Sequence, residues 1–158
     1  MTITKVQAPD KIDEVRHLFR EYEQFLDVDL CFQNFEEELA GLPGKYAPPH
    51  GALFIAVEGR HAAGCVALRK LEDGICEMKR LYVRSQYRGR GLGRILAKRV
   101  IEEAIELDYM IMRLDTLDKL KEAMKLYETL GFKRRSSYYD NPLPGVVYWE
   151  LKLKEKNG

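Results

Sequence analysis

Hydrophobic and polar positions follow two different periods along the chain. Apolar residues recur every three or four positions in three stretches, which predicts amphipathic helices at 10–26, 91–107 and 118–130. Shorter runs of β-branched, aromatic and aliphatic residues predict strands at 2–7, 53–57, 62–68, 75–83, 110–114, from 132 onward and at 146–153. The apolar residues of 32–39 predict one further short helix, and Asp10 is expected to be the N-cap of the first long helix.

These elements follow one another as strand, helix, helix, three strands, helix, strand, helix and two strands. The connection between the helix at 91–107 and the strand at 110–114 is only two residues long. That strand is therefore expected to run parallel to the strand before the helix, through a right-handed crossover. The sequence predicts an α/β fold in a single domain, residues 1–158, with a mixed, mostly antiparallel central sheet flanked by helices.

Composition narrows the class of protein. The 158 residues match one domain, and 46% apolar and 32% charged residues are values of globular proteins. A net charge of +1 argues against a nucleic-acid partner, and an apolar run long enough to span a membrane is missing from the sequence. Cys31, Cys65 and Cys76 lack paired spacing, which predicts free thiols in the cytoplasm and neither a disulfide framework nor a metal site.

A glycine-rich turn at 88–94 carries the clearest chemical signal. It follows a strand and opens the helix at 91–107, and its glycines alternate with arginines. Glycine lets the backbone approach a ligand closely, the start of a helix offers unpaired N–H groups to an anion, and arginine binds phosphate oxygens. The turn therefore predicts a pyrophosphate-binding site.

Two familiar phosphate-binding loops do not fit this turn. The Walker motif requires Gly-Lys-Ser/Thr, whereas the single Gly-Lys pair, Gly44-Lys45, is followed by Tyr46. The dinucleotide motif Gly-x-Gly-x-x-Gly requires its third glycine at position 94 or 96, where Arg94 and Leu96 stand.

The spacing Gln86-x-x-Gly89-x-Gly91 resembles the acetyl-CoA motif of the GNAT superfamily of N-acetyltransferases, and the order of elements is also that of the GNAT fold. The resemblance implies acetyl-CoA as co-substrate, without a metal. It implies that the cofactor is bound by the end of the strand and by the turn, namely Leu81, Tyr82, Val83, Arg88, Gly89, Arg90, Gly91, Leu92, Gly93 and Arg94.

A second segment, Ala123-x-x-Leu-Tyr127-x-x-x-Gly-Phe132, resembles another signature of the superfamily. There the tyrosine, Tyr127 in this chain, points at the thioester sulfur and is suited to protonate the departing thiolate. Many members carry an asparagine seven positions earlier, where this chain has Leu120, so contacts of that asparagine do not transfer. Alone, Tyr127 would be interpreted as a half-buried aromatic residue of an amphipathic helix.

Acetyl transfer to an amine also requires a base. An ammonium with a pKa near 10.4 is almost fully protonated at neutral pH, which costs about 4 kcal/mol and favours general base catalysis. Glu77 is the candidate, because a glutamate at the matching strand position often takes this proton in the GNAT superfamily; the alternative is an ordinary solvent-facing strand residue. Glu72 and Asp73, near the turn before the strand, are further candidates for the base. Backbone N–H groups near 81–83 are candidates to stabilise the oxyanion.

Two further polar segments are candidates for the acceptor site. Tyr139 and Asp140 lie in a proline-rich loop that borders the acceptor pocket in many GNAT members, or forms a rigid structural hairpin. Glu36, Glu37 and Glu38 are predicted to be a solvated helix face, with the rim of an acceptor site as the alternative.

The sequence thus predicts a cytoplasmic, acetyl-CoA-dependent N-acetyltransferase that acts directly on the primary amine of a small metabolite. A protein N-terminus or lysine is the alternative acceptor, and a non-catalytic coenzyme A-binding module is the alternative of another class. Neither nucleic acid nor membrane is expected as a partner, and a homodimer is possible.

Overall fold

The structure is a computed structural model that describes residues 1–154, apart from the side chain of Phe32. Its described part contains one sheet with the strand order β1-β2-β3-β4-β5-β7-β6. The strands are β1 (Thr2–Lys5), β2 (Ala52–Glu58), β3 (His61–Glu72), β4 (Ile75–Val83), β5 (Ile111–Leu117), β6 (Lys133–Arg135) and β7 (Val146–Lys152). The helices are α1 (Ile12–Leu26), α2 (Phe35–Ala40), α3 (Leu92–Glu106) and α4 (Lys121–Thr129), with short 3-10 turns η1 (Cys31–Gln33), η2 (Gly44–Tyr46) and η3 (Ser85–Tyr87).

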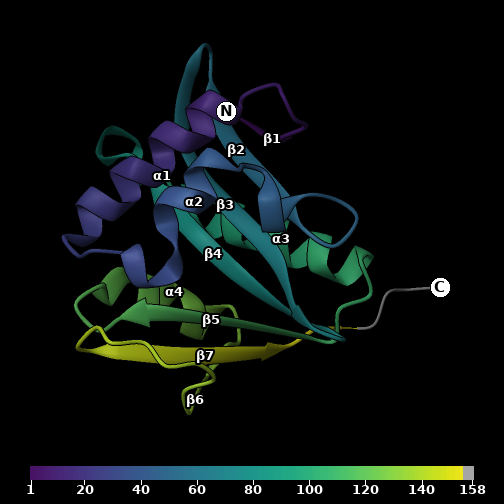
Figure 1. Cartoon of the computed structure of the whole chain (residues 1–158), viewed down its shortest axis with the longest axis vertical. Helices are drawn as coiled ribbons and strands as arrows, with labels where there is room; N and C mark the ends of the chain where they lie inside the picture. Colours follow the sequence, from purple (N-terminus) through teal and green to yellow (C-terminus); the bar gives the residue numbers. More distant parts are fainter. Residues whose placement is uncertain (155–158) are drawn as a thin grey trace.

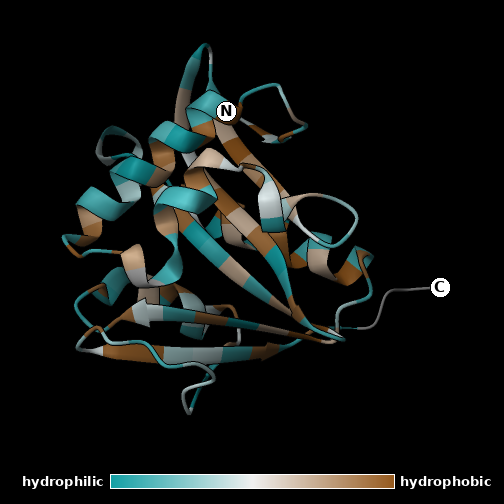
Figure 2. Ribbon diagram, viewed as in Figure 1, coloured by the Kyte–Doolittle hydropathy of each residue, from teal (hydrophilic) through white to brown (hydrophobic). Residues whose placement is uncertain are grey.

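The sheet separates two hydrophobic cores. Helices α1 and α2 lie in front of β2–β4 in Figure 1, whereas α3 and α4 lie behind the sheet. The core behind the sheet joins α3 to alternate strand residues such as Phe54, Leu68 and Met112, and the core in front joins α1 to Ile55 and Ala67. In Figure 2, β2 and β3 carry many brown, hydrophobic segments, whereas α1 is largely teal. Alternate strand positions thus face different helices, as the period of two requires.

The short pairing of β4 with β5 opens the sheet at one end. These two strands are parallel and pair only through Ile75–Glu77 and Ile111–Arg113, whereas every other neighbouring pair in the sheet is antiparallel. Beyond Glu77 the strands diverge, which is visible at the left of Figure 1. A register shift against β3 accompanies Arg80, whose φ of 60° is typical of a bulge that bends a strand. Backbone groups of β4 after Glu77 therefore lack a strand partner on the β5 side.

The predicted fold class and the predicted order of elements are confirmed, including the parallel strand after α3. The predicted N-cap is wrong. Helix α1 begins at Ile12, Lys11 precedes it in the left-handed conformation, and the cap has no side-chain hydrogen bond. Asp10 lies one residue before this cap, outside the position from which a side chain bonds the first helical N–H groups. Within residues 1–154, no helix combines the length and the apolar character needed to cross a membrane.

Candidate active site

A cavity of about 750 Å³ fills the opening between β4 and β5. Its volume lies within the range of small-molecule sites. Its walls come from the end of β4, the glycine turn, the end of β5, α4 and the last turn of α1. Its lining includes Tyr22, Phe25, Leu30, Gln33, Lys79, Leu81, Tyr82, Val83, Arg88, Gly89, Gly91, Leu92, Gly93, Arg94, Asp115, Leu126, Tyr127, Asn141 and Leu143. One continuous space thus joins the predicted cofactor loop to the other side of the sheet.

The glycine turn has the backbone of an anion-binding site. Gly89 and Gly91 have φ values of 81° and 75°, and a Cβ atom built on either would meet no atom within 4 Å. Gly91 is the N-cap of α3 and forms no side-chain cap, so the first N–H groups of the helix are open to a ligand. A Cβ at these positions would enter open space in front of the helix, as a turn built for close approach of a phosphate requires.

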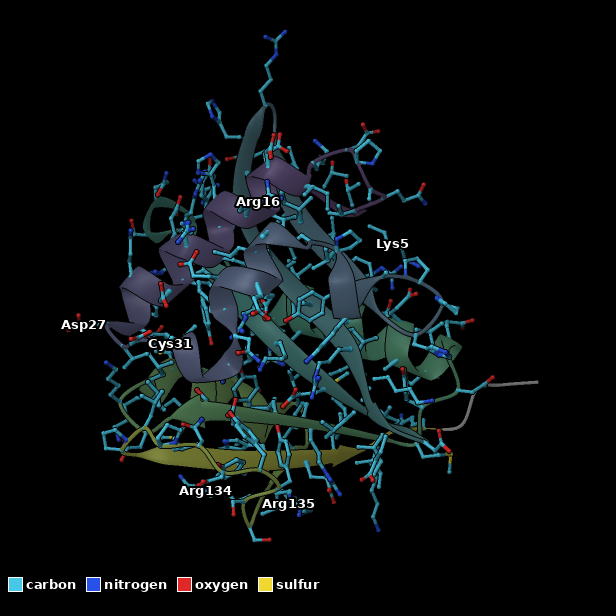
Figure 3. The ribbon with its side chains drawn as sticks, in the orientation of Figure 1. Lys5, Arg16, Asp27, Cys31, Arg134 and Arg135 are labelled. Carbon is cyan, nitrogen blue, oxygen red and sulfur yellow. The ribbon has the colours of Figure 1, made fainter. Side chains whose placement is uncertain are left out.

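The arginines of the turn divide into two groups. Arg88 and Arg94 line the cavity; Arg88 also donates to the Val83 carbonyl at 2.9 Å and stacks on the Phe25 ring. Arg90, by contrast, does not line the cavity and faces Glu58 at 3.3 Å. Arg134 and Arg135, labelled in Figure 3, belong to β6 at the edge of the sheet, and Arg135 pairs with Glu150 there.

Tyr127 lines the cavity from helix α4. Its ring packs against Phe132 and Trp149, with ring centroids 5.7 and 6.2 Å away, and the residue is 6% exposed. Within residues 1–154 its hydroxyl has no hydrogen-bond partner. Burial, with smaller contributions from Tyr22 and Asp115, raises the pKa of the Tyr127 phenol, so the hydroxyl keeps its proton at neutral pH. A fixed ring thus presents a proton donor to the cavity.

Glu77 occupies the last paired position of β4, one residue before the cavity wall begins at Met78. Its carboxylate is 2% exposed and accepts hydrogen bonds from Arg69 at 2.8 Å and from the Tyr138 hydroxyl at 2.6 Å. Burial alone would raise the pKa of this carboxyl, but the charge of Lys79 and the bonds from Tyr138 and Arg69 outweigh burial and hold it below its ordinary value. Glu77 is therefore an ionised carboxylate at the edge of the cavity.

A second carboxylate, absent from the sequence-based prediction, lines the cavity on the diverging end of β5. The Asp115 carboxylate accepts hydrogen bonds from the Tyr139 hydroxyl and, at 3.1 Å, from Asn141. Gln33 donates to the same Tyr139 hydroxyl at 3.2 Å, and its side-chain oxygen accepts from Lys79 at 3.1 Å. The predicted residue Tyr139 therefore belongs to a polar network at the cavity, whereas Asp140 is exposed.

The acidic residues of α2 are not one solvated face, and that prediction is wrong for Glu38. Glu38 accepts two hydrogen bonds from Arg80, at 2.9 and 3.0 Å, and only 17% of its side chain is exposed. Glu36 does face outward and pairs with Arg20 at 2.8 Å. The bulge at Arg80 explains the difference, because it turns a buried guanidinium toward α2 that a carboxylate must neutralise.

Comparison with known proteins agrees with this geometry. The model of the acetyltransferase (GNAT) family matches residues 12–132. The chain belongs to the GNAT family. An uncharacterized N-acetyltransferase of Schizosaccharomyces pombe is 44% identical over 157 residues, which cover 98% of this chain and 96% of the relative. The N-acetylaspartate synthetase of Danio rerio is 37% identical over 112 residues, 70% of this chain but 40% of the relative.

A solved structure from Salmonella typhimurium, described as a putative acetyltransferase with its cofactor acetyl-CoA, is similar to this chain with a TM-score of 0.69. The alignment covers 100% of this chain and 96% of that structure at 19% identity, a level that shows a shared fold. With the family match and the S. pombe relative, the protein is an acetyl-CoA-dependent N-acetyltransferase. The glycine turn with its open space and the adjoining cavity fit acetyl-CoA.

The substitution Gly91→Val tests the cofactor turn. Its side chain would enter the open space in front of α3, so we expect acetyl-CoA affinity to fall at least about tenfold, as loss of one hydrogen bond to a charged group does. Calorimetric titration with acetyl-CoA measures the change.

Gly59→Val is the matched control. Gly59 also has a positive φ, 61°, and open space around its Cβ position, but it lies in the β2–β3 turn, away from the cavity. Both variants place valine at a positive φ, which strains the backbone in each. An equal loss of affinity in both, or none in a folded Gly91→Val protein, would remove the turn from the cofactor site.

Proposed function

We propose that this GNAT enzyme transfers the acetyl group directly to the primary amine of a small metabolite. The continuous cavity carries the proposal, because it brings the glycine turn, Tyr127 and a polar network on both sides of the strand gap into one space. The N-acetylaspartate synthetase relatives are named for a small product, which supports a small acceptor.

Acetyl-CoA supplies an acetyl group already activated as a thioester. The amine nitrogen forms the new C–N bond as the C–S bond breaks and its electron pair stays on sulfur. We propose that Tyr127 gives its hydroxyl proton to this sulfur and that Glu77 receives the proton lost by nitrogen. Backbone N–H groups of β4 after Glu77, which lack a strand partner on the β5 side, stabilise the charge on the carbonyl oxygen.

The pKa values limit when Glu77 can act. Roughly six units separate an ordinary amine from an ordinary carboxyl group, so taking a proton from the free ammonium is uphill by about 8 kcal/mol. The lowered pKa of Glu77 adds to this cost. Glu77 therefore acts as nitrogen becomes positive during bond formation, through a water molecule that spans the step from the edge of the cavity.

Product formation over a panel of amines tests the proposed function. We expect acetylation of small primary amines, with release of one coenzyme A thiol per acetylated product, and weaker acetylation of peptides that present an N-terminus or a lysine. Faster acetylation of peptides would favour the protein acceptor. Binding of acetyl-CoA without any product from either panel would favour the non-catalytic module.

We also propose a cytoplasmic location. The three cysteines are free thiols, the state that the reducing cytoplasm maintains.

The cysteines also bear on the mechanism. Burial raises the pKa of the Cys76 thiol to about 12. Two of them, Cys65 and Cys76, are buried and inert as nucleophiles, which supports a structural role and direct transfer without an acyl-enzyme.

A further inference from the structure

Lys79 is a buried cation on the wall of the cavity. Its side chain is 12% exposed, and its ammonium group donates to Gln33 at 3.1 Å. The nearest carboxylate oxygen, on Glu77, lies 3.9 Å away and already accepts a hydrogen bond from Arg69. An ammonium group has three donors. Lys79 therefore has a donor to spare for an anion in the cavity.

Two other cations of the cavity lining, Arg80 and Lys119, have different surroundings from Lys79. Arg80 is held by two hydrogen bonds to Glu38. Lys119 donates to the Leu26 carbonyl at 2.6 Å, at the end of α1. Lys79 is largely buried and its carboxylate neighbour, Glu77, stays 3.9 Å away, whereas Lys119 is exposed to solvent. A ligand carboxylate that contacts the Lys79 ammonium group directly would therefore gain more there than at either of these groups.

Asp115 presents the opposite charge to the same cavity. Both of its described hydrogen bonds, from Tyr139 and Asn141, end on Oδ2. In the described part of the chain, Trp149 Nε1 is the one buried side-chain N or O atom without a partner. Asp115 Oδ1 has no such partner there either, but it is not one of the buried atoms, so it is accessible to solvent. This oxygen can accept a hydrogen bond from an ammonium group.

One glutamine sets the spacing of these two charges. Gln33 bonds Lys79 through its oxygen and Tyr139 through its nitrogen, and Tyr139 bonds Asp115. Only the side chain of Gln33 and the hydroxyl group of Tyr139 thus link the Lys79 ammonium group to the Asp115 carboxylate. Apolar residues of the same wall, Leu30 and Leu143, lie beside them.

We propose that the acceptor is a free α-amino acid, whose carboxylate binds Lys79 and whose ammonium group binds Asp115. This inference rests on the proposed function and adds the class of acceptor. An amine without the carboxylate leaves Lys79 with its donor unused, and so does a peptide N-terminus, where an amide replaces the carboxylate. Asp115 therefore selects for an amine, and Lys79 selects against amines that have no neighbouring carboxylate.

Matched acceptors test the proposal in the full-length protein. Each of several L-amino acids is compared with the amine produced by its decarboxylation and with its carboxamide, at saturating acetyl-CoA. We expect kcat/KM for the amino acid to exceed that for both analogues by about ten- to a hundredfold, as a hydrogen bond between charged groups does. Lys79→Met should abolish this preference, and Lys79→Arg should retain part of it.

The ratio between paired acceptors is the informative quantity. Lys79→Met also alters the surroundings of Glu77, but a change in catalysis affects both members of a pair alike and cancels in the ratio. Lys98→Met, at an exposed position of α3, is the control for removal of a lysine charge and should leave the ratio unchanged. Calorimetric binding of N-acetyl amino acids and of N-acetyl amines to wild type and Lys79→Met gives the same comparison without turnover.

The outcomes separate this inference from the proposed function. Small amines acetylated as well as their parent amino acids, or an unchanged ratio in a folded Lys79→Met protein, would overturn the amino-acid acceptor and leave the small-amine function standing. Acetylation of peptides alone would overturn both.

Discussion

Replacement of Tyr127 by phenylalanine is expected to lower kcat by about 10²–10⁴-fold with acetyl-CoA affinity nearly unchanged. This is the range of general acid catalysis. The substitution removes only the hydroxyl, which has no partner among residues 1–154, and keeps the ring between Phe132 and Trp149. Steady-state kinetics with a good acceptor, together with cofactor titration, measures both quantities.

The size of the effect distinguishes two roles of this hydroxyl. A thiolate whose pKa is near 8.5 is already a tolerable leaving group, so a loss of only about tenfold would mean that the hydroxyl orients the thioester. Unchanged kcat and kcat/KM would leave Tyr127 as a core aromatic residue. Tyr109→Phe is the control, because it removes another hydroxyl from a buried tyrosine, one that donates to the His50 carbonyl outside the cavity.

Glu77→Gln is expected to lower kcat/KM by about 10²–10⁴-fold near pH 7, with much of the loss recovered at high pH. Recovery follows because hydroxide, whose concentration rises with pH, can take the proton from nitrogen in place of the carboxylate, whereas the fraction of neutral amine rises equally for both proteins. The measurement is the pH profile of kcat/KM for both proteins between neutral and alkaline pH.

The titration of Glu77 does not destabilise the protein in the neutral-to-alkaline range of this pH profile. Since its folded pKa is lowered, the stability from its ion pairs is complete above its unfolded value, 4.5, and is lost only as pH falls through the folded value. Arg69→Met is the control, because it breaks the same ion pair but keeps the carboxylate. Equal losses in Glu77→Gln and Arg69→Met at every pH would mark Glu77 as a structural residue.

The sequence sufficed where the chemistry lies in one contiguous segment. The glycine turn is a local motif between a strand and a helix. The position of Tyr127 on a helix follows from the helical spacing of the apolar residues around it and from the glycine after the helix. Arg88, Gly91 and Tyr127 all line the cavity, and their roles in cofactor binding and catalysis stay predictions. Local periodicity also gave β4 its observed bounds.

The proposed acceptor side could not be found in this way, because its residues come from four separate segments. Gln33 lies in η1, Lys79 on β4, Asp115 on β5, and Asn141 in the loop before β7. Each is an ordinary polar residue in its own segment, and only the short β4–β5 pairing and the bulge bring them together. Arg80 and Glu38 illustrate the same limit, since a bulge that changes which way a strand residue faces leaves no clear trace in a period of two.

The division of the cavity between sheet and loops has a consequence for how such a protein can diverge. The donor side lies on β4, α3 and α4, where substitutions disturb the buried core, whereas Gln33 and Asn141 sit in irregular segments near the surface. Loops accept insertions and substitutions at little cost to folding. Exchange of the loop residues around Gln33 and Asn141 between relatives would therefore tune how an acceptor fits, whereas Lys79 and Asp115, which lie on β4 and β5, would keep its charge preference unchanged.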